Sequence, residues 1–209
     1  MELMEAIRGR RSVRKFKPDP VQEEDLREIL EAARWAANAG NSQPWHFLVV
    51  RGEGLRQSMA QAVERMADQM AGWPEVAEMA ARIQGSLPFW TFFREAPVTL
   101  AVLARPYEAT ADLALAQKGL PPEEVKRMRP YPGLQSVSAA IQNLLLAAHS
   151  LGYGTCWMTG PLVAYRELEE ILGVKAPWEL VALVPLGRPA DLPSSRPRRG
   201  IEEIATFLD

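Results

Sequence analysis

The chain has 209 residues, of which 47% are hydrophobic and 24% charged, and its formal net charge is −2. This composition is that of an ordinary globular protein and excludes a disordered or fibrous chain. The near balance of charges disfavours general affinity for nucleic acid, because the molecule as a whole has no strongly positive field. The length fits a single domain over residues 1–209.

Cysteine and histidine are scarce, which limits the chemistry that side chains can supply. Cys156 is the only cysteine, and the two histidines, His46 and His149, stand outside any ligand-spaced motif, so neither a disulfide nor a metal is expected. All three residues are expected to serve packing rather than redox or proton transfer. The first residues lack a secretion signal and no apolar run could span a bilayer, so we expect a cytoplasmic protein without a membrane segment.

The pattern of apolar residues predicts helices and strands along the whole chain. Apolar residues at helical spacing indicate helices, and short aromatic or β-branched runs indicate buried strands. The expected helices lie at 1–9, 22–37, 55–71 with a continuation over 75–84 left open, 134–151, 159–173 and 201–207. The expected strands lie at 45–50, 97–103, 155–158 and 179–186. This order offers few hairpins, which favours an α+β or α/β fold with one central sheet.

Three segments call for separate interpretation. The helix over 134–151 is apolar nearly all round, so it should be buried in a core or against another subunit. Residues 87–93 form an aromatic run outside any clear period, and both core packing and a substrate-facing wall remain open. Residues 105–132 contain five prolines around short helical pieces, which predicts an excursion over the body of the fold.

A cluster of cations between the first two expected helices is the first candidate functional feature. Residues 8–17 contain six basic side chains, including Arg10, Arg11 and Arg14, together with Ser12. Planar guanidinium groups bind phosphate oxygens bidentately, and such charge-assisted hydrogen bonds are strong. Three interpretations stay open from the residues alone: a phosphate-bearing small molecule, a nucleic-acid backbone, or a solvated basic patch.

Three further segments follow the cluster at characteristic distances. They are the loop Asn41-Ser42-Gln43-Pro44-Trp45, the segment from Gly154-Thr155-Cys156-Trp157 to Gly160-Pro161, and a terminal arginine group at Arg196, Arg198 and Arg199. In this order and spacing, the four segments resemble the nitroreductase family of flavin enzymes, and the resemblance covers essentially the whole chain. It implies an α+β fold with a central, mostly antiparallel sheet flanked by helices, in an intertwined homodimer with FMN at its interface.

The resemblance also implies a site residue by residue. Arg10, Ser12 and Arg14 would hold the FMN phosphate and ribityl chain, with Arg11 nearby. Arg198, or failing that Arg196, would complete the phosphate clamp from the tail.

Other implied contacts surround the flavin ring. Asn41, with Asn38 as a second candidate, would approach the flavin from the other subunit, and Gln43 belongs to the same loop. Gly160 would present its backbone N–H to the N5/O4 edge of the ring, with Trp157 and Thr159 beside it. The expected helix start at 159–161 agrees with this role, because it exposes unpaired backbone donors.

The implied activity is ping-pong oxidoreduction, in which NAD(P)H gives a hydride to flavin N5 and then leaves. A small electron acceptor such as a nitroaromatic or quinone binds in the place of the nicotinamide and is reduced. The cofactor carries the reaction, so no catalytic acid, base or nucleophile is nominated. Other members of the family destroy flavin, dehalogenate iodotyrosines or oxidise azolines, and these remain alternatives. An alternative of another class is a nucleic-acid or anion-binding module that uses Arg8 to Lys17.

Overall fold

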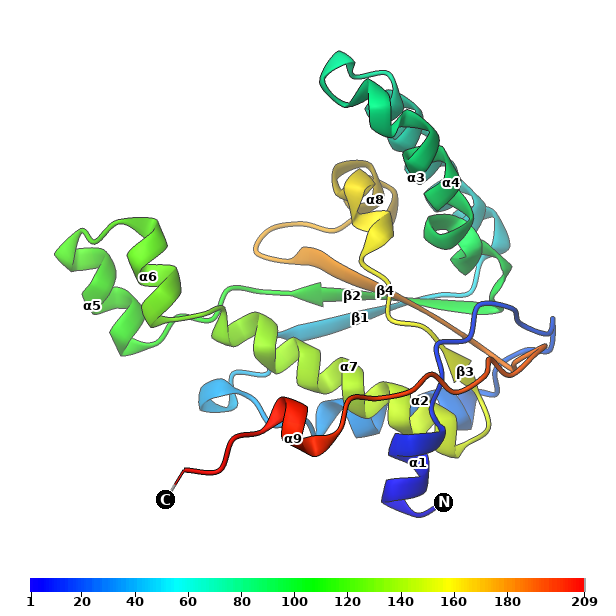
Figure 1. Cartoon of the computed structure of the whole chain (residues 1–209), viewed down its shortest axis with the longest axis horizontal. Helices are drawn as coiled ribbons and strands as arrows, with labels where there is room; N and C mark the ends of the chain where they lie inside the picture. The colour runs from blue at the N-terminus through cyan, green and yellow to red at the C-terminus, as the bar shows by residue number, and fades with distance from the viewer. Residues whose placement is uncertain (209) are drawn as a thin grey trace.

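Four runs of apolar and β-branched residues form one antiparallel sheet. In the computed structural model, which describes residues 1–208, the strands run in the order β1-β2-β4-β3 (Figure 1). Their bounds are β1 (Trp45–Val50), β2 (Val98–Ala104), β3 (Gly154–Thr155) and β4 (Glu179–Gly187). Two of them, β2 and β4, are buried along most of their length, because helices cover both faces of the sheet.

The helices occupy the segments between and around the strands. The α-helices are α1 (Leu3–Gly9), α2 (Glu23–Arg34), α3 (Glu53–Ala71), α4 (Ala80–Thr91), α5 (Thr110–Lys118), α6 (Pro122–Met128), α7 (Pro132–Ser150), α8 (Tyr165–Leu172) and α9 (Ile201–Ile204). Short 3-10 turns lie at η1 (Ala39–Asn41), η2 (Pro74–Met79), η3 (Phe92–Glu95) and η4 (Gly160–Ala164). The mixture of helices with an antiparallel sheet confirms the α+β class.

Alternation along the strands separates two hydrophobic cores. On β2, Leu100 and Val102 face the core that contains α2 and α7, whereas Ala101 and Leu103 face the core of α3, η4 and α8. The long helix α7 buries Val137, Ile141 and Leu144 in the first core, which confirms its expected burial. Among residues 1–208, no helix combines the length and apolar composition needed to cross a membrane.

Four elements differ from the expectation by more than two residues at one end. The helix expected at 159–173 begins as the 3-10 turn η4 and is α-helical only from Tyr165, the first residue of α8. Helix α2 ends at Arg34 rather than at 37, because its last turn tightens and the Ala36 N–H donates to the Ala33 carbonyl at 3.1 Å. The strand expected at 155–158 has only two residues, because pairing with β4 stops after Thr155 and returns as a single bridge at Met158. Helix α9 contains four residues instead of seven.

The aromatic run and the proline-rich segment both prove helical. The helix left open over 75–84 is present as η2 and α4, and α4 continues through Pro88 to Thr91. The proline-rich segment contains α5 and α6, which extend beyond the end of the sheet instead of lying over it (Figure 1). A bidentate ion pair from Arg129 to Asp112, at 2.9 and 3.0 Å, joins these two helices.

Candidate functional site

The arginine segment is extended because it pairs with the sheet. After α1 ends at Gly9, Ser12 forms a parallel bridge with Thr155, and Val13 is buried. Side chains alternate along an extended backbone, so Ser12 and Arg14 lie on the face opposite to Val13. Gly154 allows this close approach: a Cβ there would lie 2.7 Å from Val13 side-chain atoms.

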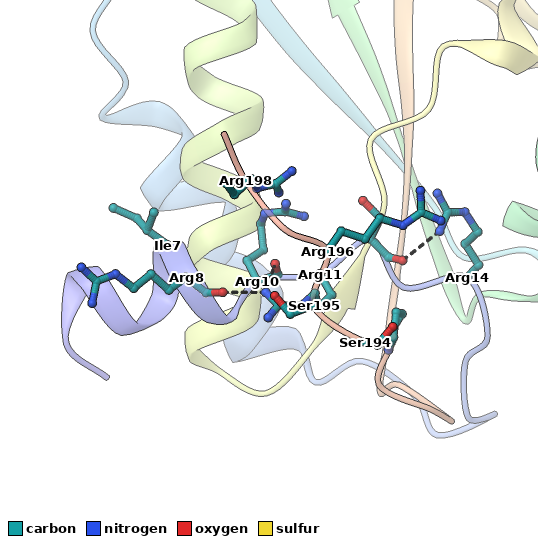
Figure 2. Close-up of a pocket in the computed structure, with 11 residues that line it drawn as sticks. Ile7, Arg8, Arg10, Arg11, Arg14, Ser194, Ser195, Arg196 and Arg198 are labelled. Carbon is teal, nitrogen blue, oxygen red and sulfur yellow. Dashed lines mark hydrogen bonds between the residues drawn. The ribbon is translucent and has the colours of Figure 1, made fainter. Parts of the chain in front are cut away.

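The C-terminal tail returns to the same place. The Ala190 N–H donates to the Lys15 carbonyl at 2.9 Å, and the Lys17 N–H donates to the Arg188 carbonyl at 2.8 Å. The N-terminal segment and the tail thus run side by side and enclose a cavity of about 610 Å³. Figure 2 shows the side chains around it, and its lining consists of Ile7, Arg8, Arg10, Arg11, Ser12, Arg14, Pro193, Ser194, Ser195, Arg196 and Arg198.

The cavity is strongly cationic. Within residues 1–208, no arginine that lines it forms an ion pair with a carboxylate. Burial, followed by the charges of Arg198 and Arg11, lowers the pKa of Arg10. Arg10 and Arg11 are partly buried, whereas the other four arginines of the lining are exposed. This concentration of positive charge without a carboxylate favours a bound anion, most of all at the partly desolvated Arg10 and Arg11.

The individual arginines differ in how they are held. Arg11 donates to the carbonyls of Arg8 and Arg10 at 2.6 and 2.9 Å, so it also closes the end of α1. Arg14 donates to the Ser12 carbonyl at 3.2 Å and is otherwise exposed. Each guanidinium has five N–H donors, so most of the donors of Arg14 remain available to a ligand.

The segment after β3 returns to the middle of β4, where Met158 and Leu183 exchange backbone hydrogen bonds of 2.9 and 3.0 Å. This segment contains the predicted ring contacts Trp157, Thr159 and Gly160. Gly160 is the first residue of η4, and Thr159 precedes it without making a side-chain cap. Among residues 1–208 the Gly160 N–H has no hydrogen-bond acceptor. A free backbone donor therefore exists where the sequence predicted one.

One loop contains Asn38, Asn41 and Gln43, and hydrogen bonds within it hold its shape. Asn41 and Gln43 have positive φ values of 50° and 45°, which non-glycine residues adopt only when the surroundings support them. The support comes from Asn38, whose Oδ1 accepts from the Gln43 N–H at 2.9 Å and whose Nδ2 donates to the Ala36 carbonyl at 3.1 Å. The Asn38 amide thus shapes the loop itself.

This loop lies at the other end of the sheet from the arginines. It leads into Trp45, which pairs with Ala104, and Ala104 pairs with Glu179 at the start of β4. The arginine segment instead bridges β3, which pairs with the end of β4 at Gly187. Nine residues of strand separate these ends by about 26 Å, so one chain does not bring all the predicted site residues together (Figure 1).

Cys156, His149 and His46 lie outside this set. Cys156 is buried beneath the arginine segment, and burial raises the pKa of its thiol, which agrees with a packing role. His149 lies against Gly9, and burial together with Arg10 and Arg11 lowers its pKa. The His46 ring packs on Trp178 with centroids 5.5 Å apart.

Sequence reasoning missed several residues of the site. Ser194 and Ser195 line the cavity, and the only available signal was their position beside the terminal arginines. Arg8 lines it too, although the sequence placed it in the cation cluster without a role toward FMN. Trp90 is a larger omission, because it contacts Gly160 from a helix far away in sequence. In the described part of the chain no group of metal-ligating side chains occurs.

The whole-chain comparison identifies the family. The model of the Nitroreductase family matches residues 7–188. The chain belongs to the nitroreductase family. It is therefore an oxidoreductase, and the family assignment covers every predicted site residue except Arg196 and Arg198 in the tail.

Named relatives within the family have different activities. A protein of Methanothermobacter thermautotrophicus, provisionally named NADH dehydrogenase/NAD(P)H nitroreductase, is 30% identical, and the match covers 94% of this chain and 82% of the relative. The 5,6-dimethylbenzimidazole synthase of Rhodospirillum rubrum is 33% identical, with 87% and 79% covered.

Solved structures of the family share the fold. A BluB-like flavoprotein from Clostridium difficile 630 superposes with a TM-score of 0.92 and 32% identity over the full length of both chains. A provisionally named nitroreductase from Desulfovibrio desulfuricans, solved in complex with FMN, gives a TM-score of 0.67 and 26% identity over 100% and 98% of the two chains.

Proposed function

We propose that this nitroreductase-family protein is an FMN-dependent oxidoreductase that transfers hydride from NAD(P)H to a small electron acceptor such as a nitroaromatic or quinone. The observation that carries the proposal is the cavity closed by two arginine groups from opposite ends of the chain. A phosphate monoester carries close to two negative charges and three acceptor oxygens, which suits unpaired guanidinium groups. Arg10, Arg14, Arg196 and Arg198 would hold the FMN phosphate, with Ser12 as a hydroxyl donor.

The remaining predicted residues would serve the ring. FMN, when bound, supplies the hydride chemistry between the nicotinamide and the acceptor. The free N–H of Gly160 would donate to the electron-rich edge of the ring, and such a fixed donor favours the reduced over the oxidised flavin. Trp157, which is 38% exposed, and Thr159 would line the same side.

A second copy of the chain would complete the site. The loop with Asn41 and Gln43 lies about 26 Å along the sheet from the arginine segment, so it would contact flavin bound by another subunit. A homodimer with FMN at its interface satisfies this requirement. The proposal therefore assigns Asn41 to the partner's flavin and the arginines to their own.

The first experiment is the visible spectrum of the purified protein, followed by chromatography of whatever cofactor heat releases. The expected result is a flavin spectrum and a released compound that elutes as FMN. Anaerobic stopped-flow with NADH and with NADPH should then bleach the flavin with at least one of them. A colourless protein that also fails to bind added FMN would overturn the proposal.

A second candidate function is supported by a separate observation. The BluB-like flavoprotein matches this chain with a TM-score of 0.92, and the 5,6-dimethylbenzimidazole synthase is 33% identical. In that case the flavin itself would be consumed in air after reduction. Aerobic incubation with NAD(P)H and excess FMN separates the two: constant total flavin supports acceptor reduction, whereas its steady loss to a benzimidazole supports the synthase.

The nucleic-acid alternative predicts a different response. Binding through Arg8 to Lys17 would weaken steeply with salt, because counterions are released from the phosphate backbone. Fluorescence anisotropy with labelled DNA and RNA at two salt concentrations tests it. The absence of salt-dependent binding would exclude this module.

A further inference from the structure

Trp90 of α4 lies directly against Gly160 of η4. A Cβ built on Gly160 would lie 2.5 Å from Cδ1 and 2.7 Å from Nε1 of Trp90. The five-membered edge of the indole therefore occupies the space that any other side chain at position 160 would need. Glycine is required here by packing, since its φ is not among the positive values of the chain.

The backbone next to Trp90 is anchored to the neighbouring helix. The hydroxyl of the next residue, Thr91, donates to the Leu87 carbonyl at 2.8 Å, which closes the last turn of α4. Arg94 follows in η3, where it is ion-paired with Glu64 of α3, and its carbonyl accepts from the buried Arg56 at 3.3 Å. The end of α4 is thus fixed to α3, and the Trp90 side chain packs against the core formed by α3, η4 and α8.

The peptide at Gly160 is constrained from its other side as well. Pro161 is buried, and its ring fixes the backbone angle directly after Gly160. The bridge between Met158 and Leu183 fixes the chain just before it. A glycine has no side chain to limit rotation of its peptide, so the Trp90 indole supplies the missing constraint.

We propose that Trp90 is a positioning residue of the flavin site: its indole packs on Gly160 and fixes the direction of the free Gly160 N–H. The inference rests on the proposed function, because that N–H acts on the flavin ring. A donor contributes to catalysis only when it is held in place before the reaction. The aromatic run 87–93 then has divided roles, with Phe93 buried in the core, Phe89 exposed and Trp90 supporting the site.

A double-mutant cycle tests the contact without reference to flavin. Gly160→Ala should lower the Tm by about 2–10 °C, because an added methyl meets the indole. The same substitution in a Trp90→Leu background should lower the Tm clearly less, because the smaller leucine side chain leaves room for the added methyl group. Equal losses in both backgrounds would show that the two residues do not touch and would overturn the inference.

The positioning role is tested on the purified protein with bound FMN. Trp90→Leu should weaken FMN binding and reduce the preference for reduced flavin about tenfold, which corresponds to a potential shift of about 30 mV for a two-electron couple. Trp90→Phe should lie between this variant and the wild type, since it retains an aromatic ring. Phe89→Leu is the matched control, because Phe89 is the neighbouring aromatic residue and is 61% exposed; both its potential and its FMN affinity should remain those of the wild type.

The outcomes separate this inference from the proposed function. One outcome is that the double-mutant cycle shows an interaction between the two residues while Trp90→Leu leaves both the flavin potential and the FMN affinity unchanged. That result would overturn the positioning role, although flavin binds. If the wild-type protein binds no FMN, both the proposed function and the role of Trp90 toward flavin are overturned. A double-mutant cycle that still shows an interaction between Trp90 and Gly160 would then confirm the contact alone.

Discussion

Arg10 and Arg14 reach the cavity from one extended segment, and neither has a carboxylate partner among residues 1–208. Replacing either residue with alanine should raise the Kd for FMN about 10- to 100-fold, since a hydrogen bond to a charged group is worth about 1.5–3 kcal/mol. Lys15→Ala is the matched control, because Lys15 directly follows Arg14 in the same segment but pairs with Asp191 at 3.3 Å. Titration of FMN fluorescence measures the Kd of all three variants. Arginine variants that bind FMN as tightly as the wild type would exclude this phosphate clamp.

His149 should make stability depend on pH. Its pKa is lowered from 6.5 by burial, Arg10 and Arg11, so the folded protein binds the proton less tightly than the unfolded chain. The resulting stability is complete above pH 6.5 and is lost as the pH falls toward the lowered pKa. Urea unfolding without FMN should therefore show a smaller loss between pH 7.5 and 5.5 in His149→Gln than in the wild type. The exposed His46 provides the control, and an identical loss in His149→Gln would contradict the assignment.

At the scale of elements, Tyr153 connects the end of α7 with the start of α2. Its hydroxyl donates to Asp25 at 2.6 Å and accepts from the Gln22 N–H at 3.3 Å, while the Arg188 guanidinium lies 4.0 Å from its ring centroid. Tyr153→Phe should lower the free energy of unfolding by about 1–3 kcal/mol, because it retains the ring contact and removes a hydrogen bond to a carboxylate. Urea denaturation measures this free energy of unfolding. Tyr165→Phe, at an exposed tyrosine, should have almost no effect.

The elements themselves were largely predictable from periodicity. Helix α7 and strands β2 and β4 have long apolar patterns, and the structure confirms all three. Helix α4 was hidden because Pro88 and the aromatic run obscure its period. The Val13 N–H donates to the Thr155 carbonyl beside β3, a contact between residues 142 positions apart that no local pattern encodes.

At the scale of the whole molecule, the site could be predicted in its parts but not in its assembly. The two arginine groups were recognisable by composition, yet their meeting depends on backbone pairing of Lys15 and Lys17 with the tail. Trp90 reaches Gly160 only because α4 packs on η4, so no sequence pattern distinguishes it from the other three aromatic residues in its run. The Asn41 loop lies at the far end of the same sheet, so under the proposed function one chain holds only part of the site.

The tail should have two separable roles, one in assembly and one in phosphate binding. Ile201, Ile204 and Phe207 are 61%, 59% and 80% exposed in the single chain, and a second subunit would cover such residues. Deleting residues 193–209 should therefore weaken both the dimer and FMN binding. Arg196→Ala/Arg198→Ala should weaken only FMN binding, because it leaves the apolar residues in place.

Size-exclusion chromatography with light scattering, together with FMN titration, distinguishes these roles. The double variant should elute as a dimer with reduced flavin affinity, and the deletion should shift toward monomer. If the deletion stays fully dimeric, the tail is not part of the interface. If the double variant retains wild-type FMN affinity, the phosphate is held by the N-terminal arginines alone, and the cavity closed by the tail has another ligand.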